Sequence, residues 1–219
     1  LGVPWAFAWG NHDIPNGPEE QAFITHAHNS LYRGADSNGN YAINLDGRNG
    51  RTMWQVVCLN TSGKGSGVKP QEWLQSATAA LQQTAPANTP RFAFFHIPFQ
   101  QFEIAWKNGT ARGVAKEQPL SAKGDETLFP LLKSLDVRAC FCGHQHNNDF
   151  AGVVDGMELV FGRSTGVGGY GNTLVKKGAK LITVNGPAKQ YHWISILTDG
   201  TTWDPKPGEF LDKVPPKEK

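Results

Sequence analysis

Several residue types and patterns are scarce in this sequence, and their scarcity argues against several classes of protein. The 219 residues include only three cysteines and two methionines. Charged residues make up 18% of the chain, and the 21 lysines and arginines nearly balance the 19 aspartates and glutamates, so no nucleic-acid-binding signature or polybasic membrane surface is present. No apolar run approaches the roughly 18 residues that a membrane span requires. Function must therefore be sought in a local site.

The cysteines do not point to a disulfide framework. Cys58, Cys140 and Cys142 are odd in number, and the last two alternate along one apolar run, where they would share a strand face. We expect free thiols in the core. Residues 1–5 lack an initiating Met, a basic region and a small-residue cleavage site, as is typical of the interior of a protein. The compartment is left open; a secreted or endomembrane protein would carry its signal peptide upstream of these residues.

Apolar runs of strand length alternate with helical patterns, which predicts an α/β protein. We expect strands at residues 5–9, 41–45, 52–59, 92–95 and 137–142, with shorter ones at 153–154, 158–161, 181–184 and 193–197. We expect helices around 19–29, over 70–81 and over 128–135, the last bent or delayed by Pro130. A long loop is expected from Pro98 to about Asp125. Residues 1–200 would form one domain portion and 201–219 an irregular tail.

Polar side chains follow three of these strands at the point where each strand ends. They are Asn11, His12 and Asp13 after the first, His96 after the run 92–95, and His144 and His146 after the run 137–142. Imidazole, amide and carboxylate groups together suit a borderline divalent metal. His144 and His146 are two residues apart, so both would point to one side if the backbone stays extended, with Gly143 permitting the tight exit. His26, His28 and His192 are interpreted as ordinary hydrogen-bonded histidines.

These residues form recognisable motifs. Gly10-Asn11-His12-Asp13, the isolated His96 and Gly143-His144-Gln145-His146 resemble, in order, the third, fourth and fifth motifs of the calcineurin-like metallophosphoesterase superfamily. Trp5, residues 103–106 and 148–150, and Tyr170-Gly171 resemble the purple-acid-phosphatase-like branch of fungi and plants. The resemblance covers residues 5 to about 197. It implies an α/β fold of four layers, with two mixed β-sheets flanked by helices.

The resemblance also implies a binuclear metal centre and a chemistry. Asn11, His96 and His144 would ligate one metal and His146 the other, with zinc, iron or manganese as the candidate ions. Two metals about 3.5 to 4 Å apart bind phosphate oxygens and lower the pKa of a bridging water, so that hydroxide attacks phosphorus near neutral pH. His12 would act as a general acid or as a charge stabiliser for the leaving oxygen, oriented by Asp13. The implied activity is hydrolysis of phosphate esters by a phosphatase or phosphodiesterase.

The sequence leaves the role of Arg163 and the class of substrate open. Arg163 would either add a positive charge near the substrate or be a salt-bridged surface residue, and both interpretations stay open. Monoesters, diesters and nucleotides share the same core site, so the sequence does not distinguish among them.

The first two motifs of the family, Asp-x-His and Gly-Asp-x-x-Asp or -Tyr, do not occur before residue 10, so we expect the chain to be N-terminally incomplete and to hold at most one metal well. Asp149 or Asp155 would be substitutes for the lost carboxylates, although their spacing does not favour this. Three explanations are open. The chain is a piece of an enzyme that needs an N-terminal fragment of the same protein, a naturally shortened single-metal protein, or a non-catalytic metal- or phosphate-binding module.

Overall fold

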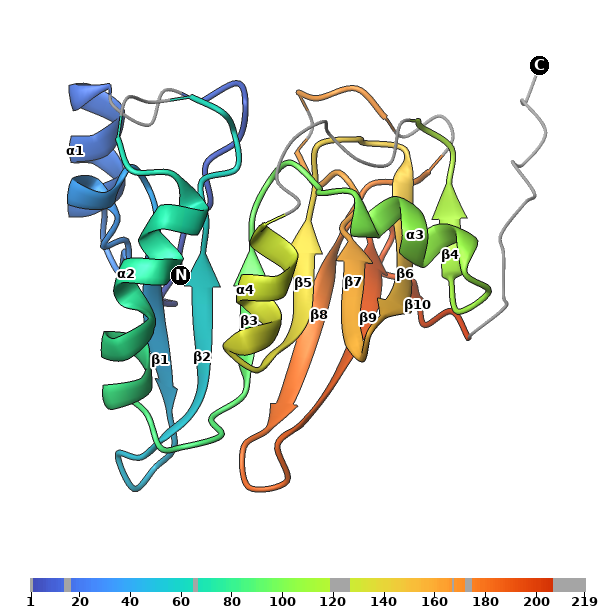
Figure 1. Cartoon of the computed structure of the whole chain (residues 1–219). Helices are drawn as coiled ribbons and strands as arrows, with labels where there is room; N and C mark the ends of the chain where they lie inside the picture. The colour runs from blue at the N-terminus through green and yellow to red at the C-terminus, as the bar shows by residue number, and fades with distance from the viewer. Residues whose placement is uncertain are drawn as a thin grey trace, which may run out of the picture.

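The computed structural model of the chain describes residues 2–13, 17–64, 67–118, 127–166, 168–171 and 175–206 (Figure 1). The helices are α1 (Pro18–His26), the short 3-10 helix η1 (Ala35–Ser37), α2 (Pro70–Gln83), α3 (Gln101–Lys107) and α4 (Leu128–Ser134). The strands are β1 (Tyr41–Asp46), β2 (Thr52–Cys58), β3 (Arg91–Phe94), β4 (Arg112–Ala115), β5 (Val137–Cys142), β6 (Asn148–Val154), β7 (Met157–Phe161), β8 (Gly178–Asn185), β9 (Gln190–Leu197) and β10 (Thr202–Trp203). The predicted α/β class is confirmed.

Seven strands form a mixed sheet in the order β1-β2-β3-β5-β7-β6-β4. Strands β2, β3, β5 and β7 are parallel neighbours, whereas β1, β6 and β4 pair antiparallel with theirs. The carboxyl ends of the four parallel strands therefore meet at one edge, the upper edge in Figure 1. This is the edge at which open α/β sheets place their sites.

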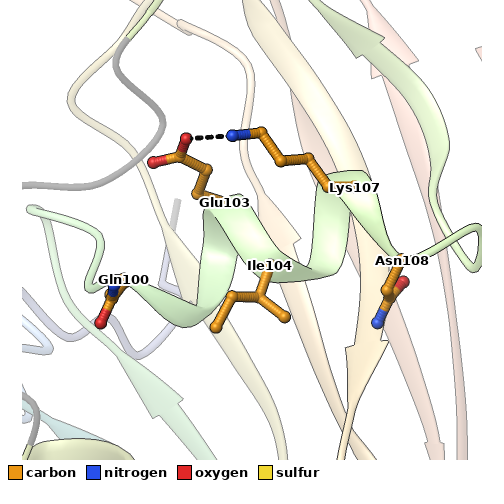
Figure 2. Close-up of a pocket in the computed structure, with 5 residues that line it drawn as sticks. All are labelled: Gln100, Glu103, Ile104, Lys107 and Asn108. Carbon is orange, nitrogen blue, oxygen red and sulfur yellow. Dashed lines mark hydrogen bonds and ion pairs between the residues drawn. The ribbon is translucent and has the colours of Figure 1, made fainter.

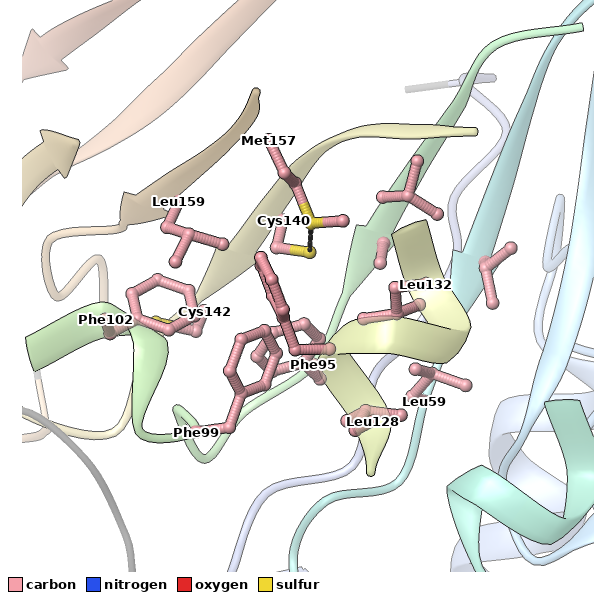
Figure 3. Close-up of a cluster of buried hydrophobic side chains, with 14 of the residues drawn as sticks. Leu59, Phe95, Phe99, Phe102, Leu128, Leu132, Cys140, Cys142, Met157 and Leu159 are labelled. Atoms are coloured by element: carbon pink, nitrogen blue, oxygen red, sulfur yellow. Dashed lines mark hydrogen bonds between the residues drawn. The ribbon is translucent and has the colours of Figure 1, made fainter. Parts of the chain in front are cut away.

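The two faces of this sheet are covered by different layers, and strand alternation sorts the side chains between them. On β3, Ala93 faces the core that α2, α3 and α4 cover, and Phe92 and Phe94 face the opposite core. On β5, Cys140 and Cys142 belong to the helix-side core, part of which Figure 3 shows. All three cysteines are free and buried, as expected.

The second sheet has three strands in the order β10-β9-β8 and packs on the other face through residues such as Trp193 and Ile182. It is antiparallel and not mixed, because β8 and β9 form a hairpin whose turn is closed by the Lys189 N–H donating to the Gly186 carbonyl at 3.1 Å. Strand β10 lies within the segment expected to be an irregular tail. It pairs with β9, and the Trp203 ring lies beneath the Arg163 guanidinium; residues 207–219 lie outside the described part.

The strand expected at residues 5–9 is not formed. Only Trp5 makes a β-bridge, to Ser30. Tyr41 replaces a neighbouring strand here, because its hydroxyl accepts from the Phe7 N–H and donates to the Phe7 carbonyl, each at 2.8 Å. Trp9 is 1% exposed. The apolar run is thus a buried extended segment that positions the residues after it.

The loop expected from Pro98 to Asp125 contains both α3 and β4. Helix α3 was missed because its seven residues are too few to show a clear period, yet it buries Phe102 and Ala105. Strand β4 is four residues long and pairs with β6 at the sheet edge. The other predicted helices and strands are present with bounds shifted by a few residues at most ends. Within the described residues, no helix combines the length and apolarity needed to cross a membrane.

Candidate metal centre

Asn11 lies in a tight turn that follows the buried Trp9. The Asp13 N–H donates to the Gly10 carbonyl at 3.1 Å, and the Gly10 N–H donates to Oδ2 of Asp13 at 2.6 Å, so backbone and carboxylate both close the turn. A Cβ on Gly10 would lie 3.1 Å from Asp13 Oδ2 and 3.3 Å from the His96 ring. Glycine therefore allows the turn to approach His96 closely.

Three side chains converge at the carboxyl ends of β3 and β5. Oδ1 of Asn11 lies 2.8 Å from Nε2 of His96 and 3.2 Å from Nδ1 of His144. The two imidazole rings meet edge to face, with centroids 5.2 Å apart and planes at 79°. The fold thus brings two ring nitrogens to one amide oxygen from positions 85 and 133 residues away in sequence.

The backbone at His144 is not extended, contrary to the expectation from sequence. His144 has a φ of 80°, and the Gln145 N–H donates to the Gly143 carbonyl at 3.1 Å, which makes a three-residue γ-turn centred on His144. A positive φ is strained for a residue with a Cβ and is typical of functional sites. The Gly143 N–H donates to the His96 carbonyl at 3.1 Å and ties the two loops together. His144, not Gly143, makes the tight exit, and this directs its ring toward Asn11.

Burial favours the uncharged form of both converging imidazoles. Burial, together with the nearby His144, lowers the pKa of His96 to about 4, although the Asp13 carboxylate acts in the opposite direction. Burial also lowers the pKa of His144, against the opposing charge of Glu117. Only a neutral imidazole has a lone pair for a metal, so burial prepares both rings for ligation.

His146 and His12 lie near the same centre but contact it differently. His146 lines a cleft of about 300 Å³ together with His96 and His144. Its Nδ1 lies 2.8 Å from the Tyr170 carbonyl oxygen. His12 is exposed, and its charge lowers the pKa of both His96 and His144, which places it within electrostatic reach of them.

The carboxylate of Asp13 was expected to orient His12. In the structure it accepts the Gly10 N–H, and no hydrogen bond joins Asp13 to His12 in the described chain. Asp13 therefore stabilises the turn at residues 10–13 by accepting a backbone hydrogen bond.

Arg163 is buried in an ion pair. Its guanidinium donates to Oδ2 of Asp149 and lies over the Trp203 ring at 5.2 Å from its centroid. Asp149 has no exposed surface, pairs also with Lys180, and accepts from the Ser195 hydroxyl at 2.9 Å. These contacts match the salt-bridged interpretation of Arg163, but in the interior of the sandwich and not on its surface. Arg163 also borders the cleft of the three imidazoles.

Neither aspartate considered as a substitute ligand lies at the centre. Asp149 is committed to the buried ion pairs, and Asp155 lies in the turn between β6 and β7, at the opposite end of β7, where it pairs with Lys133 at 3.6 Å. Across the described residues, no three His, Cys, Asp or Glu side chains gather to hold a metal. A metal ion bound by His96 and His144 would therefore need a third donor of another kind, and the amide oxygen of Asn11 is the one in contact with both rings.

A larger pocket, of about 470 Å³, lies along α3 (Figure 2). Its lining residues are Gln100, Glu103, Ile104, Lys107 and Asn108. Glu103 and Lys107 form an ion pair at 2.5 Å along the helix. The lining has no imidazole, so it offers no counterpart to the centre at the sheet edge.

The two distances measured from Asn11 Oδ1 are compatible with a shared metal ion. Ligands about 2.1 Å from an ion and at right angles to each other lie about 3 Å apart, close to the observed 2.8 and 3.2 Å. Two imidazole nitrogens and an amide oxygen suit zinc, iron or manganese. His146 is the remaining imidazole of the cleft in the described chain, and one side chain does not hold a second ion.

The sequence reasoning missed Glu117 and the role of Tyr170. The Tyr170 hydroxyl donates to Oε1 of Glu117 at 2.5 Å, beside His146. Glu117 was placed in the expected loop, and only recognition of β4 would have brought it to the sheet edge.

Comparison with known proteins assigns the chain to a family. Residues 1–148, which contain all four candidate ligands, match the family model of the calcineurin-like phosphoesterases. Three proteins of Arabidopsis thaliana are similar along most of the chain. Probable inactive purple acid phosphatase 29 is 26% identical over 217 residues, covering 84% of this chain and 56% of that protein. Probable inactive purple acid phosphatase 14 is 26% identical, covering 78% and 51%, and probable inactive purple acid phosphatase 28 is 24% identical, covering 97% and 62%. The chain thus spans between 51% and 62% of the length of these relatives, and on the family match it belongs to the calcineurin-like phosphoesterases.

Proposed function

We propose that this protein hydrolyses phosphate esters with the help of bound metal ions, and that Asn11, His96 and His144 hold one of them. The observation that carries the proposal is the contact of Asn11 Oδ1 with His96 Nε2 at 2.8 Å and with His144 Nδ1 at 3.2 Å, in a chain of this family. Burial lowers the pKa of both imidazoles and so favours the neutral form that a metal needs. When bound, such ions supply Lewis-acid activation of the phosphate ester and of the attacking water.

The chain's own residues would bind and orient the substrate and move one proton. The cleft of about 300 Å³ accommodates a phosphate group, and His96, His144 and His146 line it. His12 is exposed and close enough to affect the pKa of both His96 and His144. In this proposal its imidazole donates a proton to the leaving oxygen, which is the role of a positioned general acid.

A complete two-metal centre needs ligands beyond those described. His146 is proposed as a ligand of the second ion, and its other ligands would come from an N-terminal segment of the same protein, outside these 219 residues. The relatives are longer than this chain, so each of them has residues beyond the matched part that could supply further ligands. Zinc, iron and manganese are the candidate ions, and Arg163 would contribute to the cleft only through its charge, since its guanidinium is paired with Asp149.

The second candidate is a non-catalytic module that binds a metal or phosphate with the same cleft. The names of the three relatives, each "probable inactive", favour it. A structural metal site needs the ligands but not His12, so His12 separates the two candidates.

The test is hydrolysis of phosphate esters by a form of the protein extended at its N-terminus and loaded with zinc, manganese or iron. His12→Ala should keep the metal and lower turnover by roughly 10² to 10⁴ on alkyl esters, with a smaller loss on nitrophenyl esters, whose leaving group needs no proton. His96→Ala should lose metal, and His192→Ala, at an exposed position on β9, should change neither. Absence of turnover by the metal-loaded wild type would favour the binding module.

A further inference from the structure

His146 is held from two directions by Tyr170. The Nδ1 of His146 lies 2.8 Å from the Tyr170 carbonyl oxygen, and the two rings stack with centroids 3.9 Å apart and planes at 14°. A carbonyl oxygen can only accept a hydrogen bond, so Nδ1 carries the hydrogen of the neutral ring. Its Nε2 then carries the lone pair. Outer partners of this kind fix the tautomer of metal-binding histidines.

Tyr170 is in turn held by Glu117. The Tyr170 hydroxyl donates to Oε1 of Glu117 at 2.5 Å, and Oε2 accepts from the backbone N–H of Asn147 at 3.2 Å and from its side-chain amide at 3.4 Å. Asn147 is the residue after His146. The contacts therefore form a closed ring that runs from His146 through Tyr170 and Glu117 back to the backbone beside His146.

Pairing of β4 with β6 fixes the position of Glu117. The backbone N–H groups of Lys116 and Glu117 donate to Oδ1 of Asn148 at 2.9 and 3.0 Å, and Nδ2 of Asn148 donates to the Glu117 carbonyl at 3.0 Å. Asn148 has no exposed surface. The buried Asn148 thus fixes the backbone of Glu117, and the Glu117 carboxylate contacts Asn147 and Tyr170.

The segment that carries Tyr170 lies flat against His146. A Cβ on Gly169 would lie 3.0 Å from Cε1 of His146, and one on Gly171, whose φ is 95°, would lie 3.1 Å from Cβ of His146. Lys177 is 7% exposed, and its Nζ donates to the carbonyl of Gly169 at 2.6 Å. The glycines allow the close approach and the lysine anchors it.

We propose that Glu117 and Tyr170 are positioning residues for His146, which hold its ring in the Nδ1–H tautomer and present Nε2 to the cleft. The use of that nitrogen as a metal ligand rests on the proposed function; the positioning itself does not. Tyr170 is 56% exposed, so its ring adds little to the buried core. Its removal should therefore change the state of His146 more than the stability of the fold.

The first test is the tautomer of His146 in the metal-free chain, read from long-range proton–nitrogen NMR spectra of histidine-labelled protein at a pH where the ring is neutral. Wild type should show the Nδ1–H form, and Tyr170→Ala should show a mixture of both tautomers. Tyr170→Phe keeps the stacked ring and should retain most of the Nδ1–H form, while Glu117→Gln should lie between the two. Tyr191→Phe is the control. It removes a tyrosine hydroxyl that lies away from this centre and donates to Glu158 at a distance of 2.8 Å, so it should leave His146 unchanged.

The second test is metal affinity in the N-terminally extended form, where Tyr170→Ala and Glu117→Gln should weaken binding about 10- to 100-fold, the range for partners of metal ligands. A His146 that stays in the Nδ1–H form in Tyr170→Ala, or that changes equally in Tyr191→Phe, overturns the proposal. Should Tyr170→Ala fail to fold, Glu117→Gln decides, because a variant of Glu117 that keeps the wild-type tautomer of His146 also overturns the proposal. A tautomer shift in a protein that binds no metal would keep this inference and reject the proposed function.

Discussion

Replacing Asp149 with asparagine should remove a large part of the stability of this fold. Asp149 has no exposed surface, and its carboxylate is shared by Arg163 and Lys180, whose side chains are 4% and 8% exposed. Asparagine keeps the shape and one acceptor, so no cavity opens, but two buried cations lose their counter-ion. Removal of one partner of a buried pair costs about 3 to 5 kcal/mol.

Lys180 limits this loss. Burial already lowers its pKa, and the attraction of Asp149 raises it in part. Without Asp149 its pKa falls further, so Lys180 can release its proton in the folded protein. We therefore expect a loss of about 3 kcal/mol at neutral pH, at the lower end of that range. Because the folded protein then binds fewer protons than the unfolded chain, the loss should shrink as the pH rises toward 10.5, the usual lysine value.

Urea unfolding followed by tryptophan fluorescence measures this change. Asp199→Asn is the matched control, since Asp199 forms an exposed pair with Lys176 at 2.9 Å, and it should leave the free energy of unfolding almost unchanged. A loss below about 1 kcal/mol for Asp149→Asn, the size typical of an exposed pair, would refute the reasoning.

Two further predictions concern the core. Burial raises the pKa of the Cys58 thiol to about 11 and also raises the pKa of Cys140 and of Cys142. A thiol reagent at pH 9 should therefore leave all three cysteines unreacted until denaturant is added. Rapid labelling of the native protein would contradict this. Gly39 has a φ of 83°, and a Cβ there would lie 2.1 Å from the Trp9 ring. Gly39→Ala should therefore lower the free energy of unfolding by about 2 to 4 kcal/mol in the same urea titration. An unchanged unfolding midpoint would contradict the packing described.

The long apolar strands of the fold could be predicted because they are buried on both faces. The runs at 52–59 and 137–142 sit in the middle of the sheet and contact both cores, so their composition alone marks them. The run at 5–9 has the same composition but lies beside Tyr41, whose hydroxyl takes the hydrogen bonds that a neighbouring strand would otherwise make. No local pattern reveals such a tertiary partner.

The sequence predicted which residues come together at the candidate site, but not the backbone conformation that brings them together. His96 and His144 follow the parallel strands β3 and β5, whose carboxyl ends lie together, and Asn11 follows the apolar run at residues 5–9, which is extended without forming a strand. The positive φ of His144 could not be predicted, because the turn residue expected from sequence is the neighbouring Gly143. Glu117 could not be predicted either, since its place depends on pairing of the four-residue strand β4 with β6.

The most direct test of the central claim is metal content of the 219-residue chain, measured by equilibrium dialysis against zinc or manganese. The account predicts one tightly held ion per chain, lost in Asn11→Ala, His96→Ala and His144→Ala and retained in His192→Ala. A chain that binds no ion, or a His96→Ala variant that binds as well as wild type, would contradict it.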